Sequence, residues 1–291
     1  MQKKYSWNIT FMHIYLSAIK TILIWSFNSH AVNTVLNPGK CFFVAAVLFA
    51  FWGTSYAQQE YAPAVEARIG EVEGHLNGRA QIKDSNNYNN LQQRMKTEGV
   101  NGLSIVVINN YKIEWAKSYG FADVASGKKT NNETLFQAAS NSKSLNAVGL
   151  LKLAQLKKID LNTDINTYLR SWQFPYDSLS EGKKITVTHL LSHTAGTGVH
   201  RFRGYEVTAT LPKIIQILNG QKPANNDPVR CQRVPGKASV YSGGGTTITQ
   251  ILVTDVQGQL YEDYIWQTVL KPLGMLNSSY AQTPAKRRIG Q

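Results

Sequence analysis

The sequence predicts an α+β fold, with strands early in the chain and helices after them. Two strand-like runs, Leu103 to Asn109 and Ile113 to Phe121, flank a polar turn with the sequence NNYK, which predicts a β-hairpin. After Ser140, apolar residues recur at three- and four-residue steps, as in a helix: Leu145, Val148, Leu151 and Leu156. This order favours an antiparallel sheet with helices over a parallel, doubly wound sheet.

The composition is that of an ordinary globular protein. The 291 residues carry a formal net charge of +13. Part of this charge lies in residues 1–57, which contain no Asp or Glu, and the other basic residues are scattered among acidic ones. No nucleic-acid recognition motif accompanies the charge. We therefore expect a solvated basic surface and no nucleic-acid partner.

Residues 40–57 have the pattern of a secretory signal peptide. Lys40 precedes a short apolar run, Phe42 to Trp52, and small residues then lead to Ala57. The run is shorter than the roughly 20 residues of a transmembrane helix. We expect cleavage after Ala57 and a secreted or periplasmic protein. An uncleaved membrane anchor is the alternative, and membrane contact is expected through the N-terminal segment only.

These features divide the chain into three parts. Residues 1–39 form an upstream extension, either from a start codon assigned too early or as a real N-terminal membrane helix. Residues 40–57 are the signal peptide, and residues 58–291 form the folded domain. Cys41 lies in the targeting segment, so a mature chain would keep Cys231 alone, which predicts packing and not a disulfide.

The main chemical signal is the S-x-x-K pattern of Ser140 and Lys143, placed where a loop enters the predicted helix. Three-residue spacing puts both side chains on one face of a helix. The lysine can then take the serine proton or lower the hydroxyl pKa. The helix N-terminus adds N–H donors for a developing oxyanion. Ser142 is a competing hydroxyl, but its adjacent lysine points away.

Several segments together resemble the serine β-lactamase and penicillin-binding-protein superfamily, especially its class C-like and esterase branches. They occur in the family order as FQAASNSK around Ser140, the helix-then-turn stretch from Leu153, ITVTHLLSHTAG from Ile185, YSG from Tyr241 and PLGM from Pro272. The resemblance implies a β-lactamase/transpeptidase-like fold, in which helices flank an antiparallel sheet beside an all-helical subdomain. It also implies acyl transfer to water through a Ser140 acyl-enzyme, without a cofactor.

The same resemblance assigns a role to Tyr241, which falls on the first residue of the family's Tyr-x-Asn motif. A tyrosine hydroxyl is a poor base at neutral pH, but a neighbouring ammonium such as Lys143 favours its phenolate. Gly243 stands where the motif has Asn, so a carboxamide that would contact substrate is replaced at this substrate-binding position. We therefore expect a carboxyl ester or D-amino-acid peptide as substrate in preference to a β-lactam.

Two further features limit the function. His189 and His193 are four residues apart, but no acidic ligand accompanies them, so packing or helix capping is expected for His193 and no metal. Nothing after Tyr241 fits the family's third motif, His-x-Gly or Lys-Thr-Gly, so we expect an incomplete domain without its C-terminal strands. The alternative function is an inactive fragment or pseudoenzyme that at most binds cell-wall peptide.

Overall fold

A computed structural model describes residues 13–14, 60–77, 88–180, 182–206 and 208–282. The chain divides into two compact units. We call the described residues between 60 and 131 the sheet unit, and the described residues from 132 to 282, together with residues 13–14, the helical unit. The predicted signal peptide lies outside the described residues. The prediction of an α+β fold is confirmed, because an antiparallel sheet and a set of helices occupy successive parts of the chain.

The sheet unit contains the predicted β-hairpin. Strand β4 (Gly102–Asn109) pairs antiparallel with β5 (Lys112–Asp123), in a register that places Gly102 opposite Gly120. The two turn residues, Asn110 and Tyr111, have positive φ angles of 49° and 62°, which is the type I′ geometry of two-residue hairpin loops. β5 pairs on its other side with β6 (Lys128–Lys129), whereas β4 has β5 as its strand partner within the described residues.

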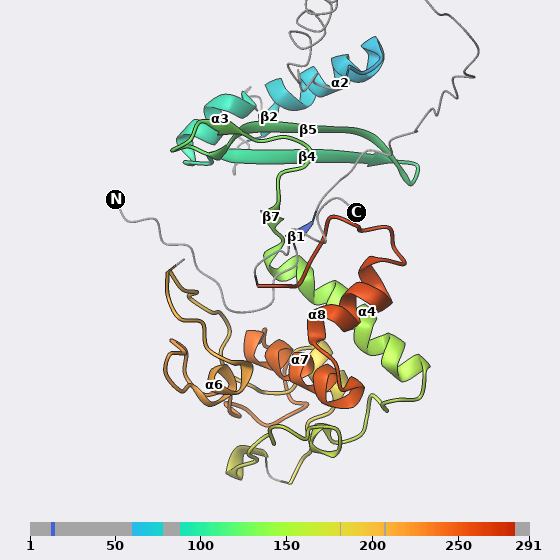
Figure 1. Ribbon diagram of the computed structural model, residues 1–291, viewed down its shortest axis with the longest axis vertical. Helices are drawn as coiled ribbons and strands as arrows, with labels where there is room; N and C mark the ends of the chain where they lie inside the picture. The colour runs from blue at the N-terminus through green and yellow to red at the C-terminus, as the bar shows by residue number, and fades with distance from the viewer. Residues whose placement is uncertain (1–12, 15–59, 78–87, 181, 207, 283–291) are drawn as a thin grey trace, which may run out of the picture. The chain divides into compact units, whose positions relative to one another are not determined.

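Short elements precede the hairpin in the same unit. They are α2 (Pro63–Gly74), the paired strands β2 (Leu76–Asn77) and β3 (Tyr88–Asn89), and α3 (Leu91–Thr97). Helix α2 lies beside the sheet (Figure 1), where Glu73 accepts a hydrogen bond of 2.9 Å from the Tyr119 hydroxyl and pairs with Lys117 at 2.8 Å. Both partners lie on β5, so side-chain contacts hold α2 against that strand.

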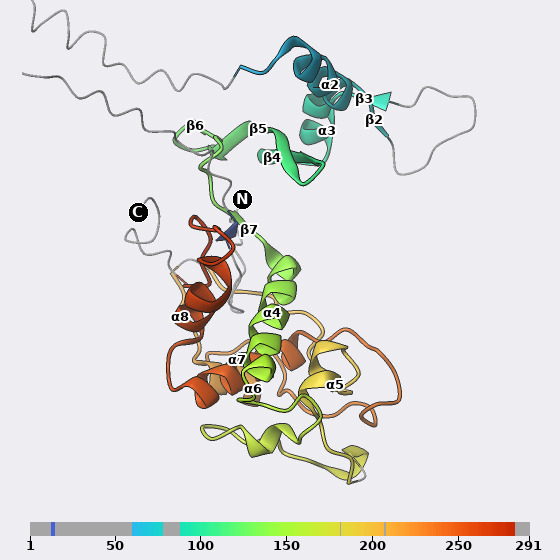
Figure 2. The same ribbon diagram turned by 90° about the vertical axis from the view of Figure 1, so that its right-hand side faces the viewer.

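The helical unit is organised around α7 (Gly243–Gln257). Every residue from Gly243 to Val253 is buried, as expected for a helix covered on all sides. Its neighbours are visible in Figures 1 and 2: α4 (Ser142–Gln155), α5 (Val187–Leu191), α6 (Ile214–Asn219) and α8 (Tyr261–Ile265). The α8 helix continues into a π-helical turn, Trp266–Leu270. The N-termini of α4 and α7 carry the residues that the sequence singled out.

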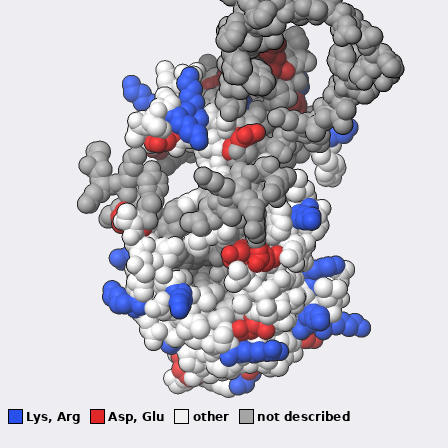
Figure 3. Space-filling view, in the orientation of Figure 1, with Lys and Arg blue, Asp and Glu red and all other residues white. Residues whose placement is uncertain are grey.

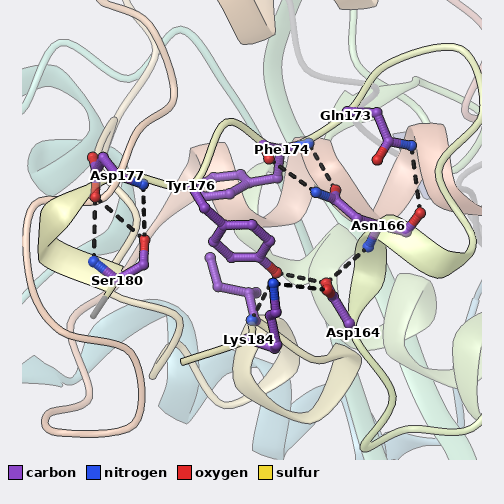
Figure 4. Close-up of polar contacts among 9 residues, drawn as sticks. Asp164, Asn166, Gln173, Phe174, Tyr176, Asp177, Ser180 and Lys184 are labelled. Carbon is purple, nitrogen blue, oxygen red and sulfur yellow. Dashed lines mark hydrogen bonds and ion pairs between the residues drawn. The ribbon is translucent and has the colours of Figure 1, made fainter. Parts of the chain in front are cut away.

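The connection between α4 and α5 is irregular but held by a polar network centred on Asp164 (Figure 4). The carboxylate accepts hydrogen bonds from the Tyr176 hydroxyl at 2.6 Å and from the Asn166 amide at 3.0 Å. Lys184 lies 3.8 Å from the same carboxylate and 4.6 Å from the centre of the Tyr176 ring. The Tyr176 hydroxyl in turn accepts from the amide of Ile185 at 3.0 Å, so the network fixes the chain just before α5.

A short strand also lies just before Ser140: β7 (Phe136–Gln137) pairs antiparallel with β1 (His13–Ile14).

Among the described residues, no helix has the length and apolar character that spanning a membrane requires. On the face drawn in Figure 3, lysine and arginine side chains alternate with acidic ones and do not gather in one patch.

Candidate active site

Ser140 lies in a 3-10 turn, Ala139–Asn141, that leads directly into α4. Its neighbour Ala139 has a φ of 46°, in the left-handed region that residues with a side chain rarely adopt. The Ser140 side chain is exposed, whereas Ser142, two residues further on, is buried at 5% relative accessibility. The structure therefore presents Ser140 to a substrate and encloses Ser142.

Lys143 extends from the first turn of α4 to the Ser140 hydroxyl, as the S-x-x-K spacing predicts. Its ammonium nitrogen donates a hydrogen bond of 3.2 Å to the Ser140 Oγ atom. The side chain is half-buried, so this charge is partly shielded from water. A positive charge at this position favours the ionised form of any hydroxyl next to it.

Tyr241 completes the arrangement from the segment that leads into α7. Its hydroxyl lies 2.6 Å from the Ser140 Oγ atom, and the Lys143 ammonium lies 4.8 Å from the centre of its ring. Three residues that the sequence analysis selected therefore lie within direct contact of one another. A serine next to a proton acceptor and an ammonium is the arrangement that nucleophilic catalysis requires.

The electrostatics of the site lower the pKa of the Tyr241 hydroxyl. Burial on its own would raise the pKa of Tyr241, but hydrogen bonding with Lys143 and Ser140 and the positive charges of Lys143 and Arg201 outweigh it. The net result is a pKa below the ordinary tyrosine value. A larger fraction of Tyr241 is therefore ionised near neutral pH than of a solvated tyrosine, and the ionised form can accept a proton. Sequence reasoning missed Arg201, because no spacing pattern connects it to the tyrosine.

His193 supports the tyrosine from the other side. The two rings lie 4.7 Å apart, and the His193 Nδ1 atom accepts a hydrogen bond of 3.3 Å from the backbone amide of Ser242. Burial, and then the nearby charge of Lys143, lower the pKa of His193. The imidazole is therefore neutral in the site and positions the segment that carries Tyr241.

Ser242 anchors this segment, a role that the sequence analysis did not assign. Its buried hydroxyl accepts from the amide of Gly245 at 2.9 Å, which caps α7, and donates to the Gly198 carbonyl at 2.8 Å. Thr197 donates a further hydrogen bond of 3.0 Å to it. A serine directly before a helical segment is a common N-cap signal, so this role was open to prediction from the sequence.

The helix that carries Lys143 is fixed by buried polar contacts. Asn146 donates to the Thr249 hydroxyl on α7 at 2.9 Å and accepts from the Tyr261 hydroxyl at 2.7 Å. Tyr280 donates to the Ser142 carbonyl at 2.6 Å. These contacts connect α4, and with it Lys143, to α7 and to later parts of the chain.

The structure places the predicted substrate-binding residue Gly243 in the first turn of α7, where it is buried. A β-carbon added there would lie 2.9 Å from the Phe202 Cε2 atom and 3.3 Å from the Val199 carbonyl oxygen. Both distances are closer than ordinary van der Waals contact, so the space next to Gly243 is already occupied.

Two further histidines, His189 and His200, make contacts with the backbone. His189 belongs to a capping box at the start of α5, where its amide donates to the Thr186 hydroxyl at 3.3 Å. His200 forms a short contact between its Nδ1 atom and the Tyr241 carbonyl oxygen. Within the described parts of the chain, no group of three or more His, Cys, Asp or Glu side chains could hold a metal ion. Cys231 is a free, buried thiol.

An α+β fold with an S-x-x-K serine at a helix start and a tyrosine hydroxyl against it defines the serine β-lactamase and penicillin-binding-protein superfamily. A comparison with family sequence profiles agrees, because the Beta-lactamase profile matches residues 88–290. This match covers well over half of the chain. The protein belongs to the Beta-lactamase family.

Curated relatives include "Protein flp" of Staphylococcus aureus (strain N315), 28% identical over 193 residues that make up 64% of this chain and 36% of flp. The "Putative penicillin-binding protein PbpX" of Bacillus subtilis (strain 168) is 29% identical over 207 residues, or 71% of this chain and 48% of PbpX. The chain therefore spans between about a third and a half of the length of these relatives.

Solved structures share the fold at low identity. EstCE1, described as a hydrolase with promiscuous acyltransferase activity, superposes with a TM-score of 0.52 at 22% identity, over 72% of this chain and 52% of EstCE1. The D-amino acid amidase of Ochrobactrum anthropi SV3 has a TM-score of 0.51 at 22% identity, over 62% of this chain and 47% of the amidase. At such identity, the likeness establishes the fold alone.

Proposed function

We propose that this chain is a serine hydrolase that transfers an acyl group to water through Ser140. The observation that carries the proposal is the 2.6 Å contact between the Ser140 and Tyr241 hydroxyls, with the Lys143 ammonium 3.2 Å from the serine oxygen. A nucleophile, a base and a positive charge converge on one exposed oxygen atom. Family membership supports the same reaction class.

The proposed reaction has two steps, acylation of Ser140 and hydrolysis of the acyl-enzyme. Ionised Tyr241 takes the Ser140 proton while the Ser140 oxygen attacks the substrate carbonyl carbon, and the oxyanion forms near the N–H groups at the start of α4. Tyr241 then returns the proton to the leaving group, the alcohol oxygen of an ester or the amine nitrogen of a peptide, as its bond to the acyl carbon breaks. In the second step Tyr241 takes a proton from water as the water oxygen attacks the acyl carbon, and it then returns this proton to the Ser140 oxygen as the acyl–serine bond breaks and the carboxylic acid leaves.

The proposed substrate is a carboxyl ester or a D-amino-acid peptide in preference to a β-lactam. Gly243 supports this preference, because it offers no carboxamide at the position where the Tyr-x-Asn motif has one. The relatives named above include a hydrolase with acyltransferase activity and a D-amino acid amidase, which agree with this class of substrate. We also propose that the protein acts outside the cytoplasm, on the basis of residues 40–57.

Labelling of the full-length chain tests the proposal. A fluorophosphonate probe and a fluorescent penicillin should each modify the wild-type protein, and Ser140→Ala should remove the label. Ser142→Ala is the matched control, because it removes a serine hydroxyl from the start of the same helix. That hydroxyl is buried, and the substitution leaves Ser140 in place. Lys143→Ala should slow labelling by roughly 10²–10⁴-fold. Label that persists in Ser140→Ala would overturn the proposal and leave the non-catalytic alternative.

A further inference from the structure

Steric crowding, and not backbone conformation, explains why glycine stands at position 243. It lies in the first turn of α7, and its φ is not in the positive range. Its added β-carbon would lie 2.9 Å and 3.2 Å from two ring carbons of Phe202. Real β-carbons essentially never approach another heavy atom within 3.0 Å. Glycine is therefore required at position 243 as long as the Phe202 ring stays in place.

The segment that carries Phe202 is fixed to the start of α7 by polar contacts. The amide of Gly244 donates to the Val199 carbonyl at 3.0 Å, and the Ser242 hydroxyl donates to the Gly198 carbonyl at 2.8 Å. His200 contacts the carbonyl oxygen of Tyr241. These contacts hold the backbone just before Phe202, so the ring can leave Gly243 only by a rotation of its own side chain.

Phe202 is partly exposed, whereas Gly243 is buried. The Phe202 ring therefore provides an apolar, partly exposed surface against Gly243, two positions after the base Tyr241 in the sequence. A carboxamide at position 243 would hydrogen-bond a substrate amide, but an aromatic ring offers apolar contact area instead. Pockets discriminate acyl chains through such contact, because one methylene in a hydrophobic pocket changes the rate of reaction about 10- to 200-fold.

We infer that Phe202 is a specificity-determining residue of this site: its ring occupies the space of a side chain at position 243 and selects esters with an apolar acyl chain. The inference rests on the proposed function, since it concerns the substrate of the Ser140 acyl-enzyme. It assigns the substrate preference to a residue outside the S-x-x-K and Tyr-x-Asn motifs.

A double-mutant cycle on the full-length chain tests the steric part. In the presence of Phe202, Gly243→Ala should lower the rate of Ser140 acylation by p-nitrophenyl hexanoate about tenfold, because overpacking displaces the Tyr241 segment. In a Phe202→Ala background, the same substitution should change the rate by no more than about twofold. Gly70→Ala, at a helix position with nothing within 4 Å of the new carbon, is the matched glycine control and should leave acylation unchanged.

The selectivity part is tested by measuring acylation of Ser140 with two esters, p-nitrophenyl hexanoate and p-nitrophenyl acetate, in the wild type and the Phe202 variants. Phe202→Ala should lower the ratio of hexanoate to acetate acylation rates about tenfold, and Phe202→Leu, which keeps an apolar side chain, should preserve most of the ratio. Equal effects of Gly243→Ala in both backgrounds, or an unchanged ratio in Phe202→Ala, would overturn the inference alone. Absence of any Ser140-dependent acylation in the wild-type protein would overturn both the inference and the proposed function.

Discussion

The hydroxyl oxygens of Ser140 and Tyr241 lie 2.6 Å apart, although 101 positions separate the two residues in the sequence. One stands at the start of α4 and the other directly before α7, so the packing of these two helices sets the distance between nucleophile and base. The Lys143 ammonium joins both, because it contacts the serine oxygen and lies over the tyrosine ring. Small changes in the α4–α7 contact should therefore affect catalysis.

Acylation should depend on the ionisation of Tyr241. Because the pKa of Tyr241 lies below the ordinary tyrosine value, the acylation rate should rise with pH and level off below about pH 10. Tyr241→Phe should lower the rate by roughly 10²–10⁴-fold and remove the rise. Stopped-flow measurement of acylation across pH checks this. Tyr111→Phe, at the exposed hairpin turn, is the control, and a Tyr241→Phe protein with the wild-type pH profile would show that another group is the base.

His193 should make the stability of the protein sensitive to acid. Burial and Lys143 lower its pKa in the folded state, so the unfolded chain binds a proton at higher pH than the folded one. By linkage, the contribution of neutral His193 is present above the unfolded value of about 6.5 and is lost as pH falls through the folded pKa.

Thermal unfolding at several pH values checks this expectation. The melting temperature of the wild type should fall more steeply between about pH 7.5 and pH 5 than that of His193→Asn, which keeps an acceptor for the Ser242 amide without a titrating ring. Parallel slopes for the two proteins would contradict the expected role of His193.

Asn146 should contribute more to stability than its size suggests. Its removal in Asn146→Ala leaves the buried Tyr261 hydroxyl without its acceptor and takes one donor from the Thr249 hydroxyl, which keeps its bond to the Thr246 carbonyl. An unsatisfied buried polar group costs about 1–3 kcal/mol, so we expect a loss of about 1–3 kcal/mol in the free energy of unfolding. Chemical denaturation measures it. Lys152→Ala, on the exposed side of α4, should change stability by less than about 0.5 kcal/mol, and an equal effect of both substitutions would contradict the prediction.

Export should remove the first 57 residues. The pattern in residues 40–57 predicts cleavage after Ala57, which leaves Gln58 at the N-terminus. N-terminal sequencing of the protein recovered outside the cytoplasm of an expressing bacterium checks this. A protein that retains Phe42 to Trp52 would instead have an uncleaved membrane anchor.

Local sequence patterns account for much of the fold. Alternation and the NNYK turn predicted the hairpin, which the structure extends slightly, from Gly102 to Asp123. The three-residue spacing predicted the contact between Ser140 and Lys143, because both residues lie on one short stretch of helical backbone. Resemblance to the family supplied Tyr241, whose place beside Ser140 no local rule could give.

Other parts of the site depend on packing between distant segments. The contact of Asn146 with Thr249 joins residues 103 positions apart, and the Phe202 ring next to Gly243 joins a loop to the start of α7. Neither carries a sequence period or motif, since the contacts arise only after the helices pack. The absence of Asn at position 243 was visible in the sequence, but its steric cause was not.

The central claim is that Ser140 forms the acyl-enzyme, and intact-mass spectrometry of the full-length chain tests it most directly. After brief exposure to p-nitrophenyl hexanoate, the wild-type protein should gain the mass of one hexanoyl group, and peptide mapping should place that group on Ser140. Ser140→Ala should gain none, and Tyr241→Phe should gain it far more slowly. An adduct that maps to another residue, or one that forms equally in Ser140→Ala, would contradict the account.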